Sequence, residues 1–175
     1  MVVVGDTAVG KTCLIRNYLY NDFNDDYVPS VLDIWEATKT FNGKEIELQL
    51  VDTSGDPYLQ LDRQLKYSKA DGFMICTAVN SVSSLENVER KWVGEISVVQ
   101  TAPMLLILTK KDLIPYLEEA ETEHITEEMV REKAEALNFT DHAMTSAKAW
   151  EDFNVHKAFD SAIQAAYYNK YNEDL

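Results

Sequence analysis

The chain has 175 residues and a hydrophobic content of 46%, which suits one domain with a single substantial core. Its formal charge of −14 at pH 7 argues against a nucleic-acid partner or an anionic membrane surface. No apolar run approaches the roughly 18 residues of a membrane span, and no signal-peptide pattern opens the chain. We therefore expect a cytoplasmic monomer that makes no membrane contact through this chain itself, with Cys13 and Cys76 reduced in its core.

The first predicted strand, Val2–Val4, leads into the motif G-x-x-x-x-G-K-T at Gly5–Thr12, and a helix is predicted over Lys11–Asn21. A strand, a loop and a helix in this order form the context in which the motif binds phosphates. Its glycines let successive backbone N–H groups turn inward, and the helix adds the positive end of its dipole. We expect Lys11 to reach the β- and γ-phosphates and the Thr12 hydroxyl to ligate Mg²⁺. The motif predicts a nucleoside triphosphate site, and a chance Gly-rich turn is the alternative.

Strands and helices alternate along the rest of the chain. Further strands are predicted at Glu36–Phe41, Glu45–Val51, Phe73–Ala78, Met104–Leu108 and near Ala143–Thr145. Further helices are predicted at Ser83–Val99, Glu127–Leu137 and Val155–Tyr171, with a weaker one after Pro57. Asn42-Gly43 is typical of a two-residue hairpin. The pattern predicts a doubly wound α/β fold: a mostly parallel six-stranded sheet with one antiparallel edge strand, about five helices, and ligands at the carboxyl ends of the strands.

Two stretches in the first third of the chain are predicted to contact the γ-phosphate of a nucleoside triphosphate and its Mg²⁺ ion. The third strand ends in Val51-Asp52-Thr53-Ser54-Gly55, where Asp52 is placed to hold Mg²⁺ through water and Gly55 to offer an N–H group to a γ-phosphate. An ordinary strand-ending Asp in a tight turn is the competing interpretation. In the loop Tyr27-Val-Pro-Ser30-Val, a hydroxyl that closes over the metal would order the segment when the third phosphate is present.

Two later stretches favour guanine as the base. The fifth strand runs into Thr109-Lys110-Lys111-Asp112, and an Asp carboxylate accepts from both N1–H and the 2-amino group of guanine. Adenine does not present these two donors to the carboxylate, and a buried acceptor left unpaired costs a few kcal/mol. Thr145-Ser146-Ala147-Lys148 follows the last strand, where a backbone N–H group would meet the guanine O6.

Because these blocks occur in order at the ends of alternate strands, the whole chain (1–175) resembles one small G domain of the Ras-like small GTPases, and specifically of the Rho family. Stretches typical of the Rho branch are Tyr27-Val-Pro-Ser-Val, Ser84-Leu-Glu-Asn, Lys91-Trp92, Glu95-Ile96 and Thr109-Lys110-x-Asp112, the last with Thr where most small GTPases carry Asn. The acidic stretch 114–124 resembles a shortened form of the helical insert of Rho proteins.

The resemblance implies a role for each matched position. It assigns GTP or GDP contacts to Asp6, Thr7, Ala8, Val9, Gly10, Lys11, Thr12, Cys13, Phe23, Tyr27, Ser30, Gly55, Thr109, Lys110, Asp112, Ser146, Ala147 and Lys148. It assigns Mg²⁺ to Thr12, to Ser30 in switch I and, through water, to Asp52. It places effector contacts at Leu32, Asp33 and Trp35. The implied partners are effector proteins bound through switch I and switch II, the segments around Ser30 and Gly55, together with exchange or activating proteins.

Departures from the family pattern gather at the reaction centre. Hydrolysis in this family relies on a glutamine directly after the switch II glycine to orient the attacking water, and this chain has Asp56 there. Thr7 stands where most Ras and Rho proteins have glycine, and it would crowd the γ-phosphate and an incoming arginine finger. The stretch Asp52-Thr-Ser-Gly-Asp-Pro57-Tyr58 is similar to that of the GTPase-deficient Rnd subgroup. Asp56 and Thr7 are therefore predicted to impair catalysis.

Three functions stay open at this stage. The first is a signalling module that engages effectors and stays largely in its GTP form, by resemblance in control of the actin cytoskeleton. The second is a cycling GTPase helped by an activating protein, and the third is a scaffold that holds nucleotide weakly. Rho proteins usually end in a basic stretch and a prenylated cysteine, which Asn172–Leu175 lacks, so membrane association through a lipidated tail removed from this chain also stays open.

Overall fold

The computed structural model describes residues 1–23, 32–41, 43–148 and 153–171. Its strands are β1 (Val2–Gly5), β2 (Leu32–Phe41), β3 (Lys44–Thr53), β4 (Phe73–Ala78), β5 (Met104–Thr109) and β6 (Asp141–Met144). Its α-helices are α1 (Lys11–Tyr20), α2 (Gln60–Tyr67), α3 (Val82–Asn87), α4 (Gly94–Ser97), α5 (Ile114–Glu119), α6 (Glu127–Ala136) and α7 (Asn154–Tyr171). Two 3₁₀ turns, η1 (Pro57–Leu59) and η3 (Lys111–Leu113), and a π-helical turn, η2 (Val88–Val93), complete the described elements.

The six strands form one sheet in the order β2-β3-β1-β4-β5-β6. The edge strand β2 pairs antiparallel with β3, and the other pairs are parallel. The predicted fold class, including its antiparallel edge, is confirmed. Since β1 lies between β3 and β4, the loop that follows β1 leaves the sheet at its carboxyl edge, beside the ends of both neighbouring strands.

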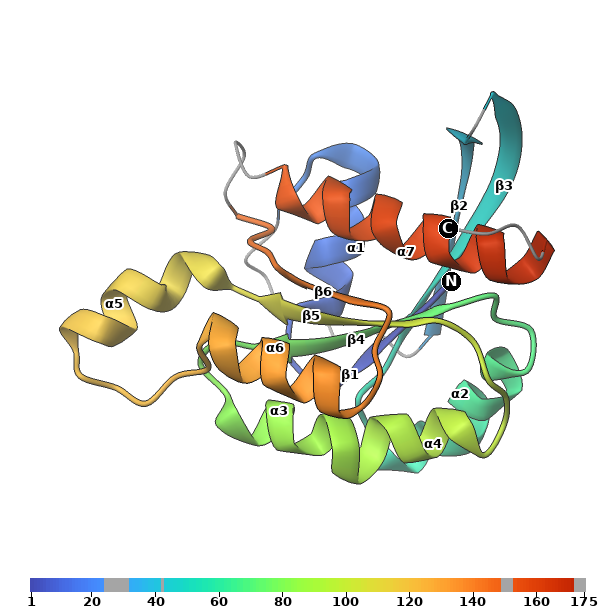
Figure 1. Cartoon of the computed structure of the whole chain (residues 1–175). Coiled ribbons are helices and arrows are strands. Elements are labelled where there is room, and N and C mark those ends of the chain that lie inside the picture. Colours follow the sequence, from blue (N-terminus) through green and yellow to red (C-terminus); the bar gives the residue numbers. More distant parts are fainter. Residues whose placement is uncertain (24–31, 42, 149–152, 172–175) are drawn as a thin grey trace.

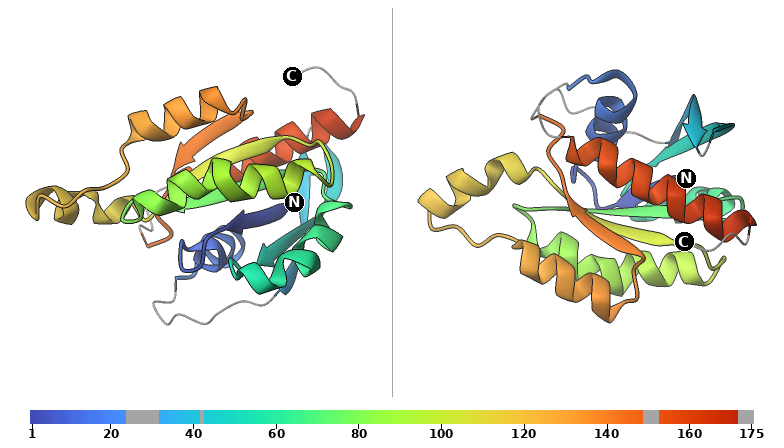
Figure 2. Two further views of the ribbon diagram at one scale, coloured as in Figure 1. Left: turned by 90° about the horizontal axis from the view of Figure 1, so that it is seen from below. Right: turned by 45° about the horizontal axis from the view of Figure 1, so that its top comes forward.

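Helices cover both faces of the sheet (Figures 1 and 2), as a doubly wound fold requires. The helices α1 and α7 lie on one face, and α2, α3, α4 and α6 lie on the other. Successive β1 side chains enter opposite cores: Val3 packs with residues of α1 and α7, while Val2 and Val4 pack with Trp92 and Ile96. This explains why the strand is apolar throughout rather than alternating.

Three element boundaries differ from the sequence-based expectation. Strand β2 begins at Leu32 rather than Glu36, because its first residues continue the antiparallel ladder with β3, from Leu32 opposite Thr53. The single helix predicted over Ser83–Val99 contains a π-helical turn, so its winding changes between α3 and α4. The last strand lies at Asp141–Met144, with Asp141 opposite Leu105 of β5.

The predicted acidic insert, 114–124, begins with helix α5, which directly follows the 3₁₀ turn η3 and stands away from the body of the domain in Figure 1. Tyr116 on this helix is exposed, as are Glu118 and Glu119. Among the helices of the described residues, none has both the length and the apolar character needed to cross a membrane.

Candidate functional site

The loop between β1 and α1 has the backbone shape of an anion cradle. Ala8 and Gly10 both have positive φ angles, 62° and 98°. Gly10 lies in a conformation that side chains disfavour, directly before the first turn of α1, and it accepts a 3.0 Å hydrogen bond from Leu14 N. Left-handed residues of this kind turn successive N–H groups into one concavity, at the positive end of a helix. The loop therefore suits the phosphates of a nucleotide.

Lys11 is buried within this loop, and its ammonium is held by the loop itself. Its Nζ donates to the carbonyl oxygens of Gly5 (2.9 Å) and Asp6 (2.7 Å). Burial lowers the pKa of Lys11, and the charges of nearby acidic groups, Asp52 and Asp6 among them, oppose that shift. The cation is thus already placed beside the cradle, where a phosphate would compensate its desolvation.

Two of the three residues predicted to bind Mg²⁺, directly or through water, are in contact with each other. The Thr12 hydroxyl, in the first turn of α1, donates to Oδ2 of Asp52 at 2.5 Å. Asp52 is fully buried near the end of β3, so its carboxylate is held rigidly behind the Thr12 oxygen. A hydroxyl backed by a carboxylate is an oxygen donor set that suits Mg²⁺. The residues present therefore fit that metal. The third predicted ligand, Ser30, and the nucleotide contact Tyr27 lie outside the described residues.

The residues predicted to bind the base meet at one edge of the loop cluster. Ser146 Oγ donates to Oδ1 of Asp112 at 2.6 Å, which fixes the orientation of that carboxylate. Asn17 Nδ2, from α1, donates to the Ala147 carbonyl oxygen at 3.0 Å and holds the last base-contacting loop. Lys148 Nζ lies 6.0 Å from the centre of the Phe23 ring, so the predicted aromatic flank and the last loop are neighbours.

Thr109 and Lys110 join the base-binding strand to the phosphate loop. Thr109 Oγ1 lies 2.5 Å from the Val9 carbonyl oxygen and 2.9 Å from that of Thr77 on β4, and it is buried. Lys110 Nζ donates to the Ala8 carbonyl oxygen at 2.8 Å, and burial lowers its pKa. The threonine that replaces the usual asparagine thus still ties two segments of the site together.

A cluster on α3 and η2 was not recognised in the sequence, although its stretches were quoted as Rho-like. Asn87 Nδ2 donates to Oδ2 of Asp6 at 2.7 Å, and Trp92 Nε1 donates to Oδ1 of the same carboxylate at 2.9 Å. Lys91 Nζ donates to the Gly55 carbonyl oxygen at 3.0 Å. One helical segment therefore holds both the phosphate loop and switch II.

Switch II lies directly against the phosphate loop at Gly55. A Cβ atom added to this glycine would lie 2.3 Å from Thr7 N and 2.5 Å from the Asp6 carbonyl carbon, so the close approach requires glycine. The next residue, Asp56, accepts a 2.9 Å hydrogen bond from Tyr58 N through Oδ1 and caps the turn η1. The Thr7 side chain is exposed on the loop, and Cys13 is half-buried on α1.

The three predicted effector contacts lie in different environments. Asp33 is exposed, Leu32 packs partly against the core beneath α2, and Trp35 packs on the α1 side, 5.9 Å from the Tyr20 ring centre. The larger exposed apolar surface is elsewhere, on the outer side of η1 and α2, where Tyr58, Leu61 and Leu65 are largely exposed. Leucines on the solvent side of an amphipathic helix could have indicated this surface in the sequence.

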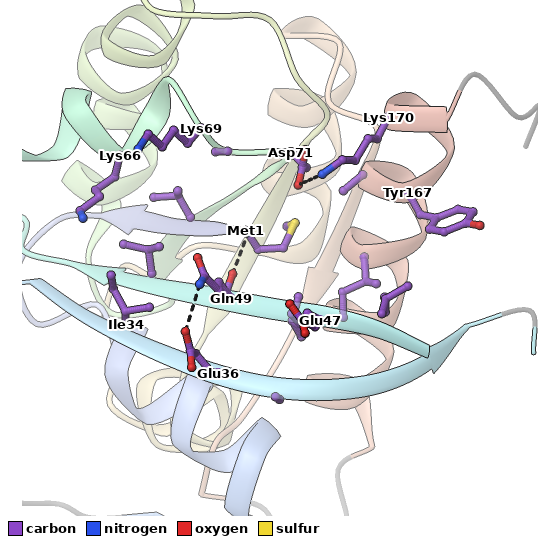
Figure 3. Close-up of a pocket in the computed structure, with 18 of the residues that line it drawn as sticks. Met1, Ile34, Glu36, Glu47, Gln49, Lys66, Lys69, Asp71, Tyr167 and Lys170 are labelled. Atoms are coloured by element: carbon purple, nitrogen blue, oxygen red, sulfur yellow. Dashed lines mark hydrogen bonds and ion pairs between the residues drawn. The ribbon is translucent and has the colours of Figure 1, made fainter. Parts of the chain in front are cut away.

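A groove of about 730 Å³ lies at the opposite end of β1, where Met1 N donates to the Gln49 carbonyl oxygen at 2.9 Å (Figure 3). The groove runs between the β2–β3 hairpin and the end of α7, and an ion pair between Lys170 and Asp71 (3.0 Å) borders it. Since the phosphate loop follows the carboxyl end of β1, this groove is separate from the nucleotide site.

Comparisons with known proteins agree with the geometry of the site. The Ras family model matches residues 1–168. The chain is 35% identical over 184 residues to the Rho-related GTP-binding protein RhoB of Homo sapiens, covering 98% of this chain and 90% of that protein. The RhoB proteins of Mus musculus and Rattus norvegicus match with the same identity and coverage.

Proposed function

Since this chain belongs to the Ras family, and within it to the Rho small GTPases, we propose that it is a signalling switch that binds GTP with Mg²⁺ and hydrolyses it very slowly. It would engage effectors through switch I and switch II in the cytoplasm, and its output would depend on abundance, location and partners rather than on a hydrolysis timer. The alternative is a GTPase that still cycles with the help of an activating protein.

The observation that carries this proposal is the position of the Asp56 carboxylate. Its Oδ1 accepts from Tyr58 N, so the side chain serves as the cap of the 3₁₀ turn η1. Pro57 follows at the first position of that turn, where its fixed φ angle stabilises the capped geometry. A residue that orients an attacking water must offer both an acceptor and a donor. An ionised carboxylate offers no donor, and this one is engaged with its own backbone.

Charge and bulk at the same centre support the proposal. Asp56 adds a negative charge beside a phosphoryl group whose transfer needs positive charge. Thr7 adds a branched side chain on the phosphate loop directly beside Gly55, whose Cβ position would lie 2.3 Å from Thr7 N. An arginine supplied by an activating protein would have to enter this space. Its contribution is worth about 10³- to 10⁵-fold in rate, so obstruction there also weakens assisted hydrolysis.

The site contains the protein groups that nucleotide binding requires. Lys11 and the backbone N–H groups of the loop would hold the phosphates, and Thr12 with Asp52 would hold Mg²⁺. When bound, the metal would neutralise phosphate charge. Asp112, oriented by Ser146, would select guanine. These contacts favour tight binding over a scaffold that holds nucleotide weakly.

The test is single-turnover GTP hydrolysis by the wild type and by the double variant Thr7→Gly/Asp56→Gln. We expect the double variant to hydrolyse GTP about 10- to 1,000-fold faster, because it restores a water-orienting donor and removes the obstruction. The variant Asp62→Gln, which removes an exposed carboxylate on α2, is the matched control and should leave the rate unchanged. A wild-type rate equal to that of the double variant would support the cycling alternative.

A further inference from the structure

The Asp6 carboxylate in the phosphate loop is bound by two donors from one helical segment. Trp92 Nε1 donates to its Oδ1 at 2.9 Å, and Asn87 Nδ2 donates to its Oδ2 at 2.7 Å. Both carboxylate oxygens are thus engaged by N–H groups. Because hydrogen bonds to an ionised acceptor are roughly twice as strong as neutral ones, these two contacts give the carboxylate one strongly preferred position.

The two donors lie on the face of the sheet opposite α1. Asn87 ends α3 and Trp92 lies in η2, between α3 and α4, and Figure 1 shows these helices across the sheet from α1. The carboxylate is therefore held away from the N-terminus of α1, where nucleotide phosphates would bind. An Asp6 side chain without these donors could turn toward the phosphates, and its negative charge would then repel them.

The backbone of Asp6 also serves the site. Its carbonyl oxygen accepts the 2.7 Å hydrogen bond from Lys11 Nζ. The residue before it, Gly5, lies against β4, since a Cβ atom added there would be 2.3 Å from the Cys76 carbonyl oxygen. The loop is thus fixed at Gly5 by close packing and at Asp6 by side-chain hydrogen bonds. A shift of Asp6 would move both the loop backbone and an acceptor of the Lys11 ammonium.

Trp92 is firmly anchored in the core. It is fully buried, and its ring lies between two cations, with Lys91 Nζ 4.0 Å and Arg63 Cζ 5.1 Å from the ring centre. Arg63 is held in turn by a two-pronged ion pair with buried Glu95, at 2.7 and 2.9 Å. A buried indole N–H group needs an acceptor, and Asp6 supplies it, so the tryptophan and the loop constrain each other.

The π turn η2 explains how both side chains reach one carboxylate. Asn87 and Trp92 are five residues apart, and in a regular α-helix such residues point about 140° apart. The wider winding of η2 returns them to one side of the helix. A π turn inside a helix is frequently found at a functional site. Here the irregular winding coincides with the two contacts to the phosphate loop.

We propose that Asn87 and Trp92 are positioning residues of the nucleotide site, which hold the Asp6 carboxylate away from the phosphates and place the Asp6 carbonyl oxygen for Lys11. The inference rests on the proposed nucleotide binding and deepens it. It assigns part of the affinity for the β-phosphate to two side chains that act only through the loop.

The test exchanges the two polar partners and measures GDP affinity by competition with a fluorescent GDP analogue. In Asn87→Asp two carboxylates would face each other, so GDP affinity should fall about 30-fold. In Asp6→Asn/Asn87→Asp an amide and a carboxylate face each other again, and the Trp92 N–H group keeps its acceptor. This double variant should recover GDP affinity to within about threefold of the wild type. A double variant as weak as Asn87→Asp would overturn the inference.

GMP separates positioning from general damage, because it has the same base but lacks the β-phosphate. Asn87→Asp and Trp92→Phe should lower GDP affinity about 10- to 30-fold and change GMP affinity by less than about twofold. Equal losses for both ligands would mean that the variants damage the whole site, which would overturn the positioning role. Glu86→Gln, which removes an exposed carboxylate one residue before Asn87, is the matched control and should bind as the wild type does.

The same measurements distinguish a failure of this inference from a failure of the proposed function. A wild-type protein that binds neither GDP nor GMP would refute the proposed function. A wild-type protein that binds GDP, with an Asn87→Asp variant that binds it equally well, would refute only the role of the Asp6 contacts.

Discussion

The Thr12 hydroxyl donates a 2.5 Å hydrogen bond to Oδ2 of Asp52, which joins the first turn of α1 to the buried end of β3. The bond places a hydroxyl oxygen and a carboxylate on one side of the phosphate cradle, although the two residues are 40 positions apart in the chain. This pair is the part of the site on which metal-dependent nucleotide binding would depend.

Replacing Asp52 with asparagine should remove most of the metal dependence of nucleotide release. Asparagine can still accept from Thr12, but it lacks the charge that a divalent cation requires behind its ligands. In the wild type, chelation of Mg²⁺ should speed release of a fluorescent GDP analogue by about 10- to 100-fold. In Asp52→Asn, release should already be fast and should change little on chelation. Glu119→Gln, an exposed change on α5, is the control, and an unchanged chelation response in Asp52→Asn would contradict the metal assignment.

Asp112 should decide which base is bound. Asp112→Asn replaces an acceptor with a donor where guanine presents two donors, so GTP affinity should fall by about 100-fold while the weak affinity for ATP changes little. Ser146→Ala removes the 2.6 Å hydrogen bond that orients the Asp112 carboxylate, and it should lower the affinity for GTP about tenfold. Competition binding with GTP and ATP measures both effects. An undiminished preference for GTP in Asp112→Asn would place base recognition elsewhere.

Breaking the buried ion pair beneath switch II should destabilise the fold. Arg63→Met leaves the Glu95 carboxylate buried without its cation, which should lower the free energy of unfolding by about 3–5 kcal/mol. Urea denaturation at fixed nucleotide concentration measures this change. Arg131→Met, which removes an exposed arginine on α6, is the control and should leave the midpoint in place. A small effect of Arg63→Met would mean that the pair contributes little to holding α2 on α4.

The two cysteines should differ in reactivity toward thiol reagents. Cys76 is fully buried on β4, and burial raises the pKa of its thiol to about 12. At pH 8 a thiol with this pKa is ionised in about one molecule in 10⁴, and the thiolate is the reactive form. Native protein should therefore show slow modification of Cys76, whereas half-buried Cys13 should react faster and be protected by bound nucleotide.

The pH dependence of this thiol has a definite sign. Because the folded pKa lies above the ordinary value of 9.0, the folded state holds its proton more tightly than the unfolded state. The contribution of Cys76 to stability is fully present below about pH 9 and is lost as the pH rises toward 12. Cys76→Ala should remove that part of the alkaline decline, measured by denaturation between pH 8 and about 11. If stability declined identically with pH in the wild type and in Cys76→Ala, the alkaline decline would not come from the Cys76 thiol.

The sequence predicted the parts of this molecule that depend on local pattern. The apolar run of β1, the glycine-containing loop and the periodic helix α1 are adjacent in the chain, and each follows from short-range preferences of its residues. The sequence pair Asn42-Gly43 similarly predicted a hairpin; Asn42 lies outside the described residues, and β2 and β3 pair with Phe41 opposite Lys44. The start of β2 was missed because Leu32–Trp35 joins the sheet only through its partner strand.

The contacts that hold the phosphate loop and switch II could not be predicted in this way. Asp6 meets Asn87 and Trp92 across 81 and 86 residues of chain, and these bonds depend on a π turn that the usual helical period does not indicate. Arg63 and Glu95 are charged residues, which in a sequence are expected to be solvated. Their mutual burial follows from tertiary packing of α2 on α4.

The proposed function requires that this protein hold GTP, because its reaction centre would turn the nucleotide over very slowly. The most direct measurement is the identity of the nucleotide released when freshly purified protein is denatured and separated by ion-exchange chromatography. We expect mostly GTP, with Asp56 capping its own turn and Thr7 beside Gly55 as the cause. Mostly GDP would show that the chain completes hydrolysis during purification, and slow turnover at this reaction centre would then be wrong.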